Sequence, residues 1–156
     1  MKDVIVRKGT EKDLPKVLNL VVELAVYEKE PEAVTATLDE YKNLYNNDWY
    51  DMYLAELEGD VVGIAIFYKT FSTWKGKMLH LEDLVVSQNY RGKGIGKQLF
   101  LTVKEHAKNL GCALLKWQVL DWNEPAIRFY EGLDAIIEKE WWNGKIILDR
   151  KKYNLD

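Results

Sequence analysis

The chain has 156 residues, of which 47% are hydrophobic, so it fits one domain, residues 1–156, with a substantial core. Its 22 Lys and Arg oppose 25 Asp and Glu. This small net negative charge argues against a general nucleic-acid binder. No apolar run reaches the roughly 18 residues that a membrane span needs, so no membrane partner is expected.

The N-terminal residues and the single cysteine indicate the compartment. Met1-Lys2-Asp3-Val4 does not have the pattern of a signal peptide, and Cys112 has no second cysteine with which to form an internal disulfide. A reducing, cytoplasmic location is therefore expected. His80 and His106 stand at unrelated positions, so no metal site is expected.

The first third of the chain predicts one strand and two helices. Val4–Arg7 is a short apolar-rich strand. Thr10-Glu11-Lys12-Asp13 has the pattern of a capping box, which satisfies free amides at a helix start. Apolar residues then recur every three or four positions as far as Tyr27-Glu28, which is typical of a helix face. A second box, Thr37-Leu38-Asp39-Glu40, opens a short helix that ends at about Tyr45.

The middle of the chain predicts three strands and a long helix. Tyr53–Glu58 and Val61–Tyr68 are two strands joined in a hairpin at Gly59-Asp60. A polar turn around Trp74 leads to the next strand, Met78–Val86. The helix that follows a glycine-rich segment stops near Gly111 and carries four apolar residues on one face: Ile95, Leu99, Val103 and Ala107.

The last part of the chain predicts three strands and one helix. Ala113–Leu120 is apolar and indicates a buried strand, and Asn123-Glu124-Pro125 begins a helix, since proline is tolerated in the first turn. Ala135–Trp141 and Lys145–Leu148 predict a hairpin about Asn143-Gly144. The predicted fold class is α/β, a central mixed β-sheet flanked by helices. Its glycine turn lies at the carboxyl end of a central strand, where open α/β sheets bind ligands.

The most informative segment is the predicted strand Leu79–Val86 followed closely by Arg91-Gly92-Lys93-Gly94-Ile95-Gly96. Alternate glycines let the backbone approach a ligand, and the next helix begins with unpaired amides and the positive end of its dipole. This combination predicts an anion site, for example for a pyrophosphate. A Walker loop is excluded because Arg91 replaces its first glycine and Gln98 its hydroxyl residue, and the GxGxxG fingerprint also fails.

Arg91-x-x-Gly94-x-Gly96, together with Asn123-x-x-Ala126-x-x-Phe129-Tyr130, resembles the acetyl-CoA-binding motifs of the GNAT acetyltransferase superfamily. Two further stretches, Ser72-Thr73-Trp74-Lys75-Gly76 and Leu120-Asp121-Trp122-Asn123, are similar to the spermidine/spermine N-acetyltransferase family and closest to its thialysine acetyltransferase branch. The resemblance covers nearly the whole chain. It implies the GNAT acyl-CoA N-acyltransferase fold, acetyl-CoA as cosubstrate and a homodimer.

The resemblance implies that three segments bind acetyl-CoA. The backbone of residues 84–86 would form hydrogen bonds with the pantetheine arm, and the glycine loop would bind the pyrophosphate. The start of the helix at residues 123–126 would line the other side of the cofactor. The residues assigned to these roles are Leu84, Val85, Val86, Arg91, Gly92, Lys93, Gly94, Ile95, Gly96, Lys97, Asn123, Pro125 and Ala126.

The resemblance also implies catalytic and acceptor-binding roles. Tyr130 matches the general acid, and Glu82 matches the carboxylate that takes the amine proton through water. Tyr27 and Glu28 match positions that contact the acceptor amine. Trp74 is a further candidate for the acceptor site, through cation–π contact. The alternatives are that Tyr130 and the tryptophans fill the core or an interface, above all Trp141 and Trp142, and that Glu28 is a solvated helix end.

The residue chemistry agrees with amine acetylation. An aliphatic amine is mostly protonated near neutral pH, so an anionic Glu82-Asp83 pair would attract it and a carboxylate would accept its proton. Adjacent strand residues point to opposite faces, so only one of the two is expected to face a given cleft. We favour Glu82 as the base and Asp83 as an acceptor contact.

The expected function is transfer of the acetyl group of acetyl-CoA to a primary amine of a small cationic acceptor, thialysine- or lysine-like or a polyamine, by direct attack in a ternary complex. Ser72 stands where the polyamine-acetylating branch has an acidic residue, so the acceptor stays open. Two alternatives remain: a protein N-terminal or lysine acetyltransferase, and a non-catalytic acyl-CoA-binding module.

Overall fold

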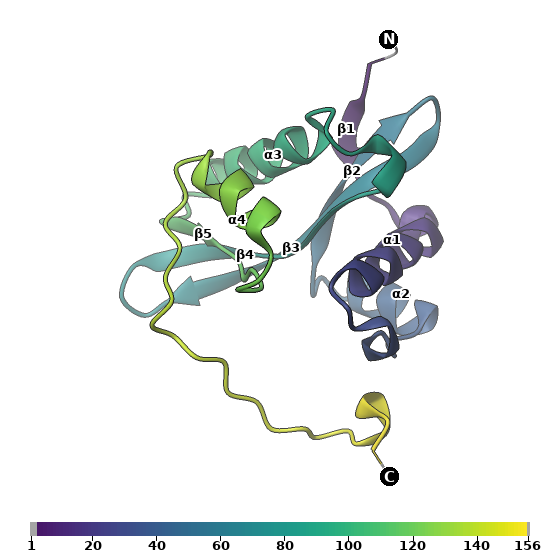
Figure 1. Ribbon diagram of the computed structural model, residues 1–156, viewed down its shortest axis with the longest axis vertical. Helices are drawn as coiled ribbons and strands as arrows, with labels where there is room; N and C mark the ends of the chain where they lie inside the picture. The colour runs from purple at the N-terminus through teal and green to yellow at the C-terminus, as the bar shows by residue number, and fades with distance from the viewer. Residues whose placement is uncertain (1–2, 156) are drawn as a thin grey trace. The chain divides into compact units, whose positions relative to one another are not determined.

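The computed structural model describes residues 3–155, and they divide between two compact units, Met1–Lys116 and Trp117–Asp156, each described by itself (Figure 1). The first unit contains strands β1 (Ile5–Lys8), β2 (Asp51–Leu57), β3 (Asp60–Ser72), β4 (Gly76–Val86) and β5 (Leu114–Lys116), and helices α1 (Leu14–Tyr27), α2 (Leu38–Asn46) and α3 (Ile95–Asn109). The second unit contains helix α4 (Glu124–Glu131) and a short 3-10 helix, Lys151–Tyr153.

The strands form a mixed sheet, as predicted, and their order in it is β1-β2-β3-β4-β5. All neighbours are antiparallel except β4 and β5, which are parallel. Strand β5 pairs only with Met78 to His80 of β4. Among the described residues, β4 therefore has no strand on that side from Leu81 to Val86. The sheet is open at the end of β4 that leads to the glycine loop.

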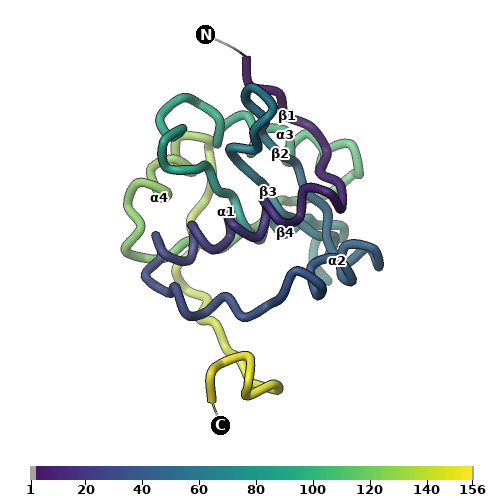
Figure 2. The backbone as a smooth tube through the Cα atoms, turned by 90° about the vertical axis from the view of Figure 1, so that its right-hand side faces the viewer, coloured from purple at the N-terminus to yellow at the C-terminus, as the bar shows by residue number. Residues whose placement is uncertain are grey.

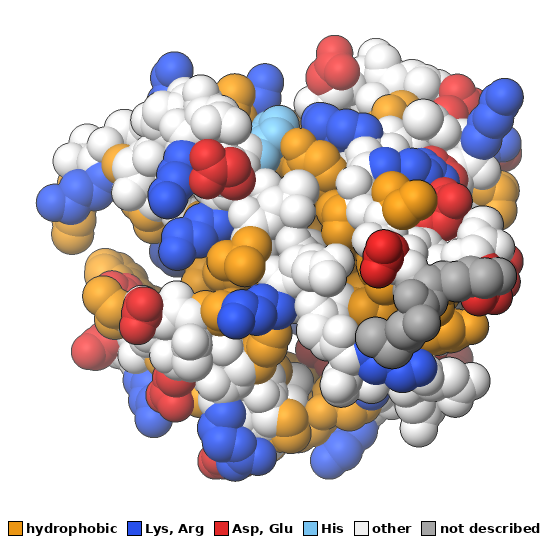
Figure 3. Space-filling view, turned by 90° about the horizontal axis from the view of Figure 1, so that it is seen from above, with side chains coloured by type: hydrophobic (Ala, Val, Ile, Leu, Met, Phe, Trp, Pro, Cys, Tyr) orange, Lys and Arg blue, Asp and Glu red, His pale blue; other side chains and the backbone are white. Residues whose placement is uncertain are grey.

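Helices cover both faces of this sheet. Helix α3 contacts β2, β3 and β4 on one face, whereas α1 lies against β3 and β4 on the other, with α2 beside it. In Figure 2, which faces α1 and α2, the strands and α3 lie behind them. No helix within residues 3–155 is both long and apolar enough to cross a bilayer. Acidic and basic side chains are interspersed on the face shown in Figure 3, in line with the near balance of charge.

Both predicted capping boxes are present. The Thr10 amide donates to Asp13 Oδ2 at 2.8 Å, and the Thr37 amide donates to Glu40 Oε2 at 2.7 Å. Arg7 of β1 donates to both oxygens of Asp13, which lowers the pKa of that carboxyl to about 2. The start of α1 is thus tied to the edge strand of the sheet as well as capped.

Each face of the sheet has its own apolar layer. On one face, Leu14, Val17 and Leu20 of α1 pack with strand residues that include Ile64, Ile66 and Val85. On the other face, α3 buries the four residues predicted from periodicity, Ile95, Leu99, Val103 and Ala107, and also Phe100. The prediction of this helix face is confirmed, because burial of one stripe is what the helical period encodes.

Two strand predictions near the C-terminus are wrong. The predicted strand Ala113–Leu120 is reduced to Leu114–Lys116, and residues 135–149, all of them described, form no strand, so the hairpin about Asn143-Gly144 is absent. Asn143 Oδ1 instead accepts a hydrogen bond from Gln118 Nε2 at 2.6 Å. Alternating apolar residues predict a strand only where a sheet receives it, and an isolated hairpin is marginal in water. Five large apolar side chains of this segment are 71–93% exposed: Ile136, Trp141, Trp142, Ile146 and Leu148.

Gly63 of β3 lets α3 lie close to the sheet. A Cβ at this position would be 3.0 Å from Leu99 Cδ1 and 3.1 Å from the Val85 carbonyl oxygen, which is tighter than ordinary contact.

We expect Gly63→Ala to lower the free energy of unfolding by about 1–3 kcal/mol, since α3 must move off the sheet. Urea denaturation measures the loss. Gly144→Ala is the control, because a Cβ there has open space and should change stability by less than about 0.5 kcal/mol. Equal stability of the two variants would contradict the prediction.

Candidate active site

The glycine loop has the conformation that its sequence predicts. Gly92 and Gly94 have φ angles of +74° and +79°, a region that glycine adopts without steric cost. Gly94 is the N-cap of α3, and a Cβ on either glycine would have no heavy atom within 4 Å. The first amides of α3 have no acceptor within the helix. The loop therefore has both the room and the donors for an anionic group such as a pyrophosphate.

Helix α1 holds the turn that precedes this loop. Glu23 Oε1 accepts a hydrogen bond from the Gln88 amide at 2.8 Å, and its second oxygen accepts from Ser87 Oγ at 3.4 Å. Both partners belong to the short connection between β4 and the glycines, where a 3-10 helix spans Gln88–Tyr90. Sequence reasoning did not identify Glu23. Its one signal is a carboxyl among apolar neighbours in the second half of α1.

Arg91 contacts two other predicted site residues. Its Nε donates to the Val86 carbonyl at 2.9 Å, and its guanidinium carbon lies 5.0 Å from the centre of the Tyr27 ring. Val86 and Arg91 were assigned to the cofactor and Tyr27 to the acceptor, so the structure places members of both groups in contact. The cation–π distance is within the usual range for such pairs.

A β-bulge lies at the predicted base. Ile66 pairs with Asp83 and Phe67 with Leu81, which leaves Glu82 as the extra residue of β4. The expectation that Glu82 and Asp83 point to opposite faces is wrong, since a bulge interrupts the alternation. Asp83 pairs with Ile66, which packs with the buried residues of α1, and Glu82 Oε2 lies 3.4 Å from Nε2 of His80, the partner of Tyr68 two residues further along β3. Both carboxyls therefore lie on the side of the sheet that α1 and α2 cover. Burial, with smaller effects of Asp83 and Glu82, raises the pKa of Tyr41 in α2 to about 12.

The two carboxyls of this pair ionise differently. Burial, and after it the neighbouring carboxylates of Glu82 and Glu28, together raise the pKa of Asp83 to about 7. The pKa of Glu82 is lowered, mainly by a hydrogen bond from His80. Burial also raises the pKa of Glu28 at the end of α1. Glu82 is therefore ionised at neutral pH, whereas Asp83 is protonated in a substantial fraction of molecules.

Trp74 lies outside this carboxyl cluster as the structure describes it. It is in the turn between β3 and β4, and its side chain is 81% exposed. Ser72 Oγ shapes that turn by accepting from the amides of Trp74 and Lys75 at 3.2 and 3.1 Å. A role for Trp74 toward the acceptor stays a prediction.

The second unit carries the remaining predicted residues on α4. Asn123 is the N-cap of this helix, with Oδ1 accepting from the Ala126 amide at 3.4 Å and Pro125 in the first turn, as predicted. Tyr130 is 8% exposed, and its ring centre lies 4.7 Å from Trp117 and 5.2 Å from Phe129. The helix is confirmed, and the catalytic role of Tyr130 stays a prediction.

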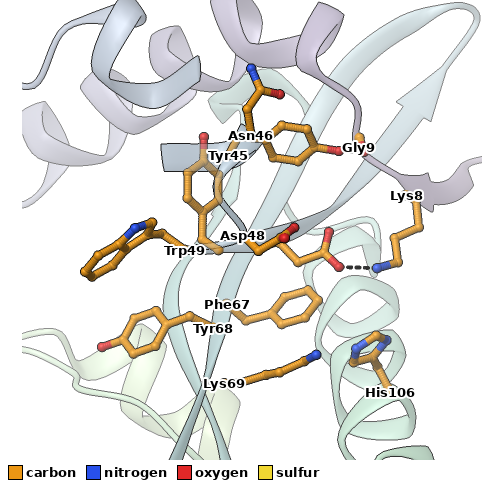
Figure 4. A pocket seen from close by; sticks show the side chains of 12 residues that line it. Lys8, Gly9, Tyr45, Asn46, Asp48, Trp49, Phe67, Tyr68, Lys69 and His106 are labelled. Carbon is orange, nitrogen blue, oxygen red and sulfur yellow. Dashed lines mark hydrogen bonds and ion pairs between the residues drawn. The ribbon is translucent and has the colours of Figure 1, made fainter. Parts of the chain in front are cut away.

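A pocket of about 720 Å³ lies beside β3, and sequence reasoning did not anticipate it (Figure 4). None of the predicted catalytic or acceptor-binding residues lines it, but Tyr68 on its wall is hydrogen-bonded to Glu82. Its walls combine aromatic rings with charged and polar side chains. Its lining residues are Lys8, Gly9, Tyr45, Asn46, Asp48, Trp49, Tyr50, Asp51, Phe67, Tyr68, Lys69 and His106.

Comparison with known proteins identifies the family. Residues 15–134 match the Acetyltransferase (GNAT) family. The chain belongs to this family. It is 36% identical over 155 residues to thialysine N-epsilon-acetyltransferase of Bos taurus, covering 92% of this chain and 91% of the relative. The thialysine N-epsilon-acetyltransferase of Caenorhabditis elegans is 30% identical over 144 residues, and the alignment covers 91% of this chain and 90% of that relative.

Solved structures agree with this GNAT fold. An aminoglycoside acetyltransferase from an uncultured soil metagenomic sample superimposes with a TM-score of 0.79 at 20% identity, covering 94% of this chain and 97% of that one. At such identity the likeness concerns the fold alone. Family membership and the sequence relatives make this GNAT protein an acetyltransferase that acts on amines.

The raised pKa of Asp83 predicts a pH-dependent gain in stability for Asp83→Asn. The folded protein holds this proton up to about pH 7, but the unfolded chain releases it near pH 3.8. Wild-type stability therefore falls as the pH rises between these values and is level above them. The variant has no such loss, so its free energy of unfolding relative to wild type should rise by up to roughly 4 kcal/mol from pH 4 to pH 8.

Urea denaturation across this pH range measures the difference between the two proteins. Asp60→Asn is the control, because Asp60 is an exposed carboxyl at the start of β3. A difference for Asp83→Asn that does not change with pH would show that this carboxyl is ionised throughout the range.

Proposed function

We propose that this protein transfers the acetyl group of acetyl-CoA to a primary amine of a small cationic acceptor, either a thialysine- or lysine-like molecule or a polyamine. The observation that carries the proposal is the group of carboxyls formed by Glu82 and Asp83, on the strand that leads to the glycine loop, and Glu28 at the end of α1. A cationic amine is attracted to such a cluster. The thialysine acetyltransferase relatives support the acceptor class.

The residues present suit acetyl-CoA, which supplies the acetyl group as a thioester when bound. The backbone of Leu84 to Val86 lies on the open side of β4 and offers polar groups to the pantetheine arm. The glycine loop from Gly92 to Lys97 and the start of α3 supply amides and positive charge for the pyrophosphate. Asn123 to Ala126 would line the other side of the cosubstrate.

The chain's residues provide for each proton in the reaction. Glu82, ionised at neutral pH, takes a proton from the acceptor ammonium through water, and Asp83 contacts the acceptor. The free amine attacks the thioester carbonyl, a C–N bond forms and the C–S bond breaks. The Tyr130 hydroxyl gives its proton to the departing thiolate, and the second proton that the amine nitrogen loses on forming the amide restores the Tyr130 hydroxyl. Attack is direct within a ternary complex, so no acyl-enzyme forms.

We also infer a homodimer in the cytoplasm. The exposed apolar side chains of residues 135–149, above all Trp141 and Trp142, support a surface that a second copy covers. Cys112 is a free, half-buried thiol, which suits a reducing compartment.

Release of thiol from acetyl-CoA tests the function against a panel of thialysine, lysine, spermidine and a peptide with free amines. We expect turnover with one or more of the small amines and initial-rate lines that intersect, as a ternary complex requires. Turnover with the peptide alone would favour a protein acetyltransferase. Binding of acetyl-CoA without turnover would favour a non-catalytic module. Parallel lines with a labelled acyl-protein would contradict direct attack, and lack of affinity for acetyl-CoA would overturn the proposal.

Tyr130→Phe tests the general acid. The aromatic packing against Trp117 and Phe129 is kept, but the proton for the leaving thiolate is lost. We expect kcat to fall by about 100-fold or more, with little change in the Kd for acetyl-CoA from calorimetry. Tyr153→Phe, at an exposed ring of the same unit, is the matched control. Unchanged kcat in Tyr130→Phe would assign this residue to the core instead.

A further inference from the structure

Two side chains from adjacent strands hold the carboxylate of Glu82. His80 Nε2 lies 3.4 Å from Glu82 Oε2, and the Tyr68 hydroxyl is also hydrogen-bonded to Glu82. Tyr68 and His80 are direct cross-strand partners of β3 and β4, and their rings are stacked with centres 5.0 Å apart and planes 27° apart. The two donors therefore form one unit that faces the same carboxylate.

Glu82 needs such support because of where it lies. As the extra residue of a bulge it has no partner in the strand ladder, and its side chain is 54% exposed. A glutamate in this setting has several rotamers to sample. Tyr68 and His80 come from paired positions of the sheet, and the His80 side chain is only 17% exposed. The rigid pair thus restricts a flexible carboxylate.

We infer that Tyr68 and His80 are positioning residues that hold the Glu82 carboxylate in the orientation needed to take the acceptor proton. The inference rests on the proposed function, in which Glu82 is the base. Neither residue touches the reacting atoms in this account. Each acts through Glu82, as supporting groups do when they orient a catalytic carboxylate.

The charges around Glu82 explain why two donors are required. Asp83 follows Glu82 in β4, and Glu28 at the end of α1 raises the pKa of Asp83. Both carboxylates of β4 also raise the pKa of Tyr41 in α2. The acidic neighbours disfavour a further negative charge at this place. His80 and Tyr68 are the groups that favour it, and the hydrogen bond from His80 has the largest effect in lowering the pKa of Glu82.

The fold contains a matched control for this pair. Tyr53 of β2 and His106 of α3 form a second tyrosine–histidine contact, with the Tyr53 hydroxyl 2.9 Å from His106 Nδ1. Their rings lie beside Phe67, on the face that α3 covers. Changes in this second pair report general effects of losing a tyrosine–histidine hydrogen bond in the same protein.

The experiment compares the full-length wild type with Tyr68→Phe, His80→Phe and the control variants Tyr53→Phe and His106→Phe. Titration of the side-chain carboxyl of Glu82 by carbon-13 NMR, assigned with Glu82→Gln, measures the orienting hydrogen bonds directly. The pH profile of kcat/KM, with the amine that the acceptor panel identifies, measures their effect on catalysis. His80→Gln retains a donor and serves as the rescue variant.

We expect Tyr68→Phe and His80→Phe each to raise the pKa of Glu82 by about one unit, to lower kcat/KM for the amine about 10-fold and to leave the KM for acetyl-CoA unchanged. The acidic limb of the pH profile should move upward, and His80→Gln should restore much of the loss. The control variants Tyr53→Phe and His106→Phe should leave the pKa of Glu82 unchanged. Tyr68→Phe and His80→Phe each keep an aromatic ring at the changed position. If one of these two variants fails to fold, the other still tests the inference.

The outcomes separate this inference from the proposed function. If the wild type acetylates an amine but the Glu82 titration and the pH profile are unchanged in both variants, the positioning role is overturned while the function stands. Equal shifts in the control variants would also overturn it. A wild type that acetylates no amine would overturn the function and, with it, the role of this pair.

Discussion

Strand β4 loses its partner on one side after His80, and the rest of the site depends on this change. Up to that residue β5 closes the sheet; beyond it, the backbone as far as Val86 has an open edge among the described residues. An open edge inside a sheet leaves polar backbone groups ready to pair with an extended ligand, which is how a strand-like pantetheine arm would bind. The same segment contains the bulge at Glu82 and ends at the turn into the glycine loop. One irregular strand therefore carries both the proposed cosubstrate surface and the proposed base.

The bulge also determines the electrostatics of the site. In a regular strand Glu82 and Asp83 would be separated by the sheet, and each would ionise nearly independently. On one side of the sheet they interact, together with Glu28, and the buried member is the one that holds its proton. The exposed member is ionised, and the hydrogen bonds from His80 and Tyr68 lower its pKa. Two neighbouring carboxyls with different ionisation are suited to separate tasks, one to accept a proton and one to contact a cationic substrate.

Local features of this structure were predictable from the sequence, and non-local ones were not. The two capping boxes, the buried face of α3 and the left-handed glycines follow from residues within a few positions of one another. The bulge at Glu82 depends on the register with β3, and the contact of Glu23 with Gln88 joins residues 65 apart. The predicted hairpin within residues 135–149 failed for the same reason, since its alternating pattern does not say which strand would receive it. The sequence named candidate residues for the site, but it did not show how they face one another.

Helix α1 connects the two halves of the proposed chemistry in the first unit. Its middle holds the turn before the glycine loop through Glu23, and its end places Tyr27 against Arg91 and Glu28 beside Asp83. Three buried leucine and valine side chains of α1 anchor it to the sheet on the same face as Val85. These contacts belong to one helix, so the glycine loop and the acceptor side share a single support. Asp13, directly before α1, accepts hydrogen bonds from the Thr10 amide and from Arg7 of β1, and these bonds fix the segment from which this helix starts.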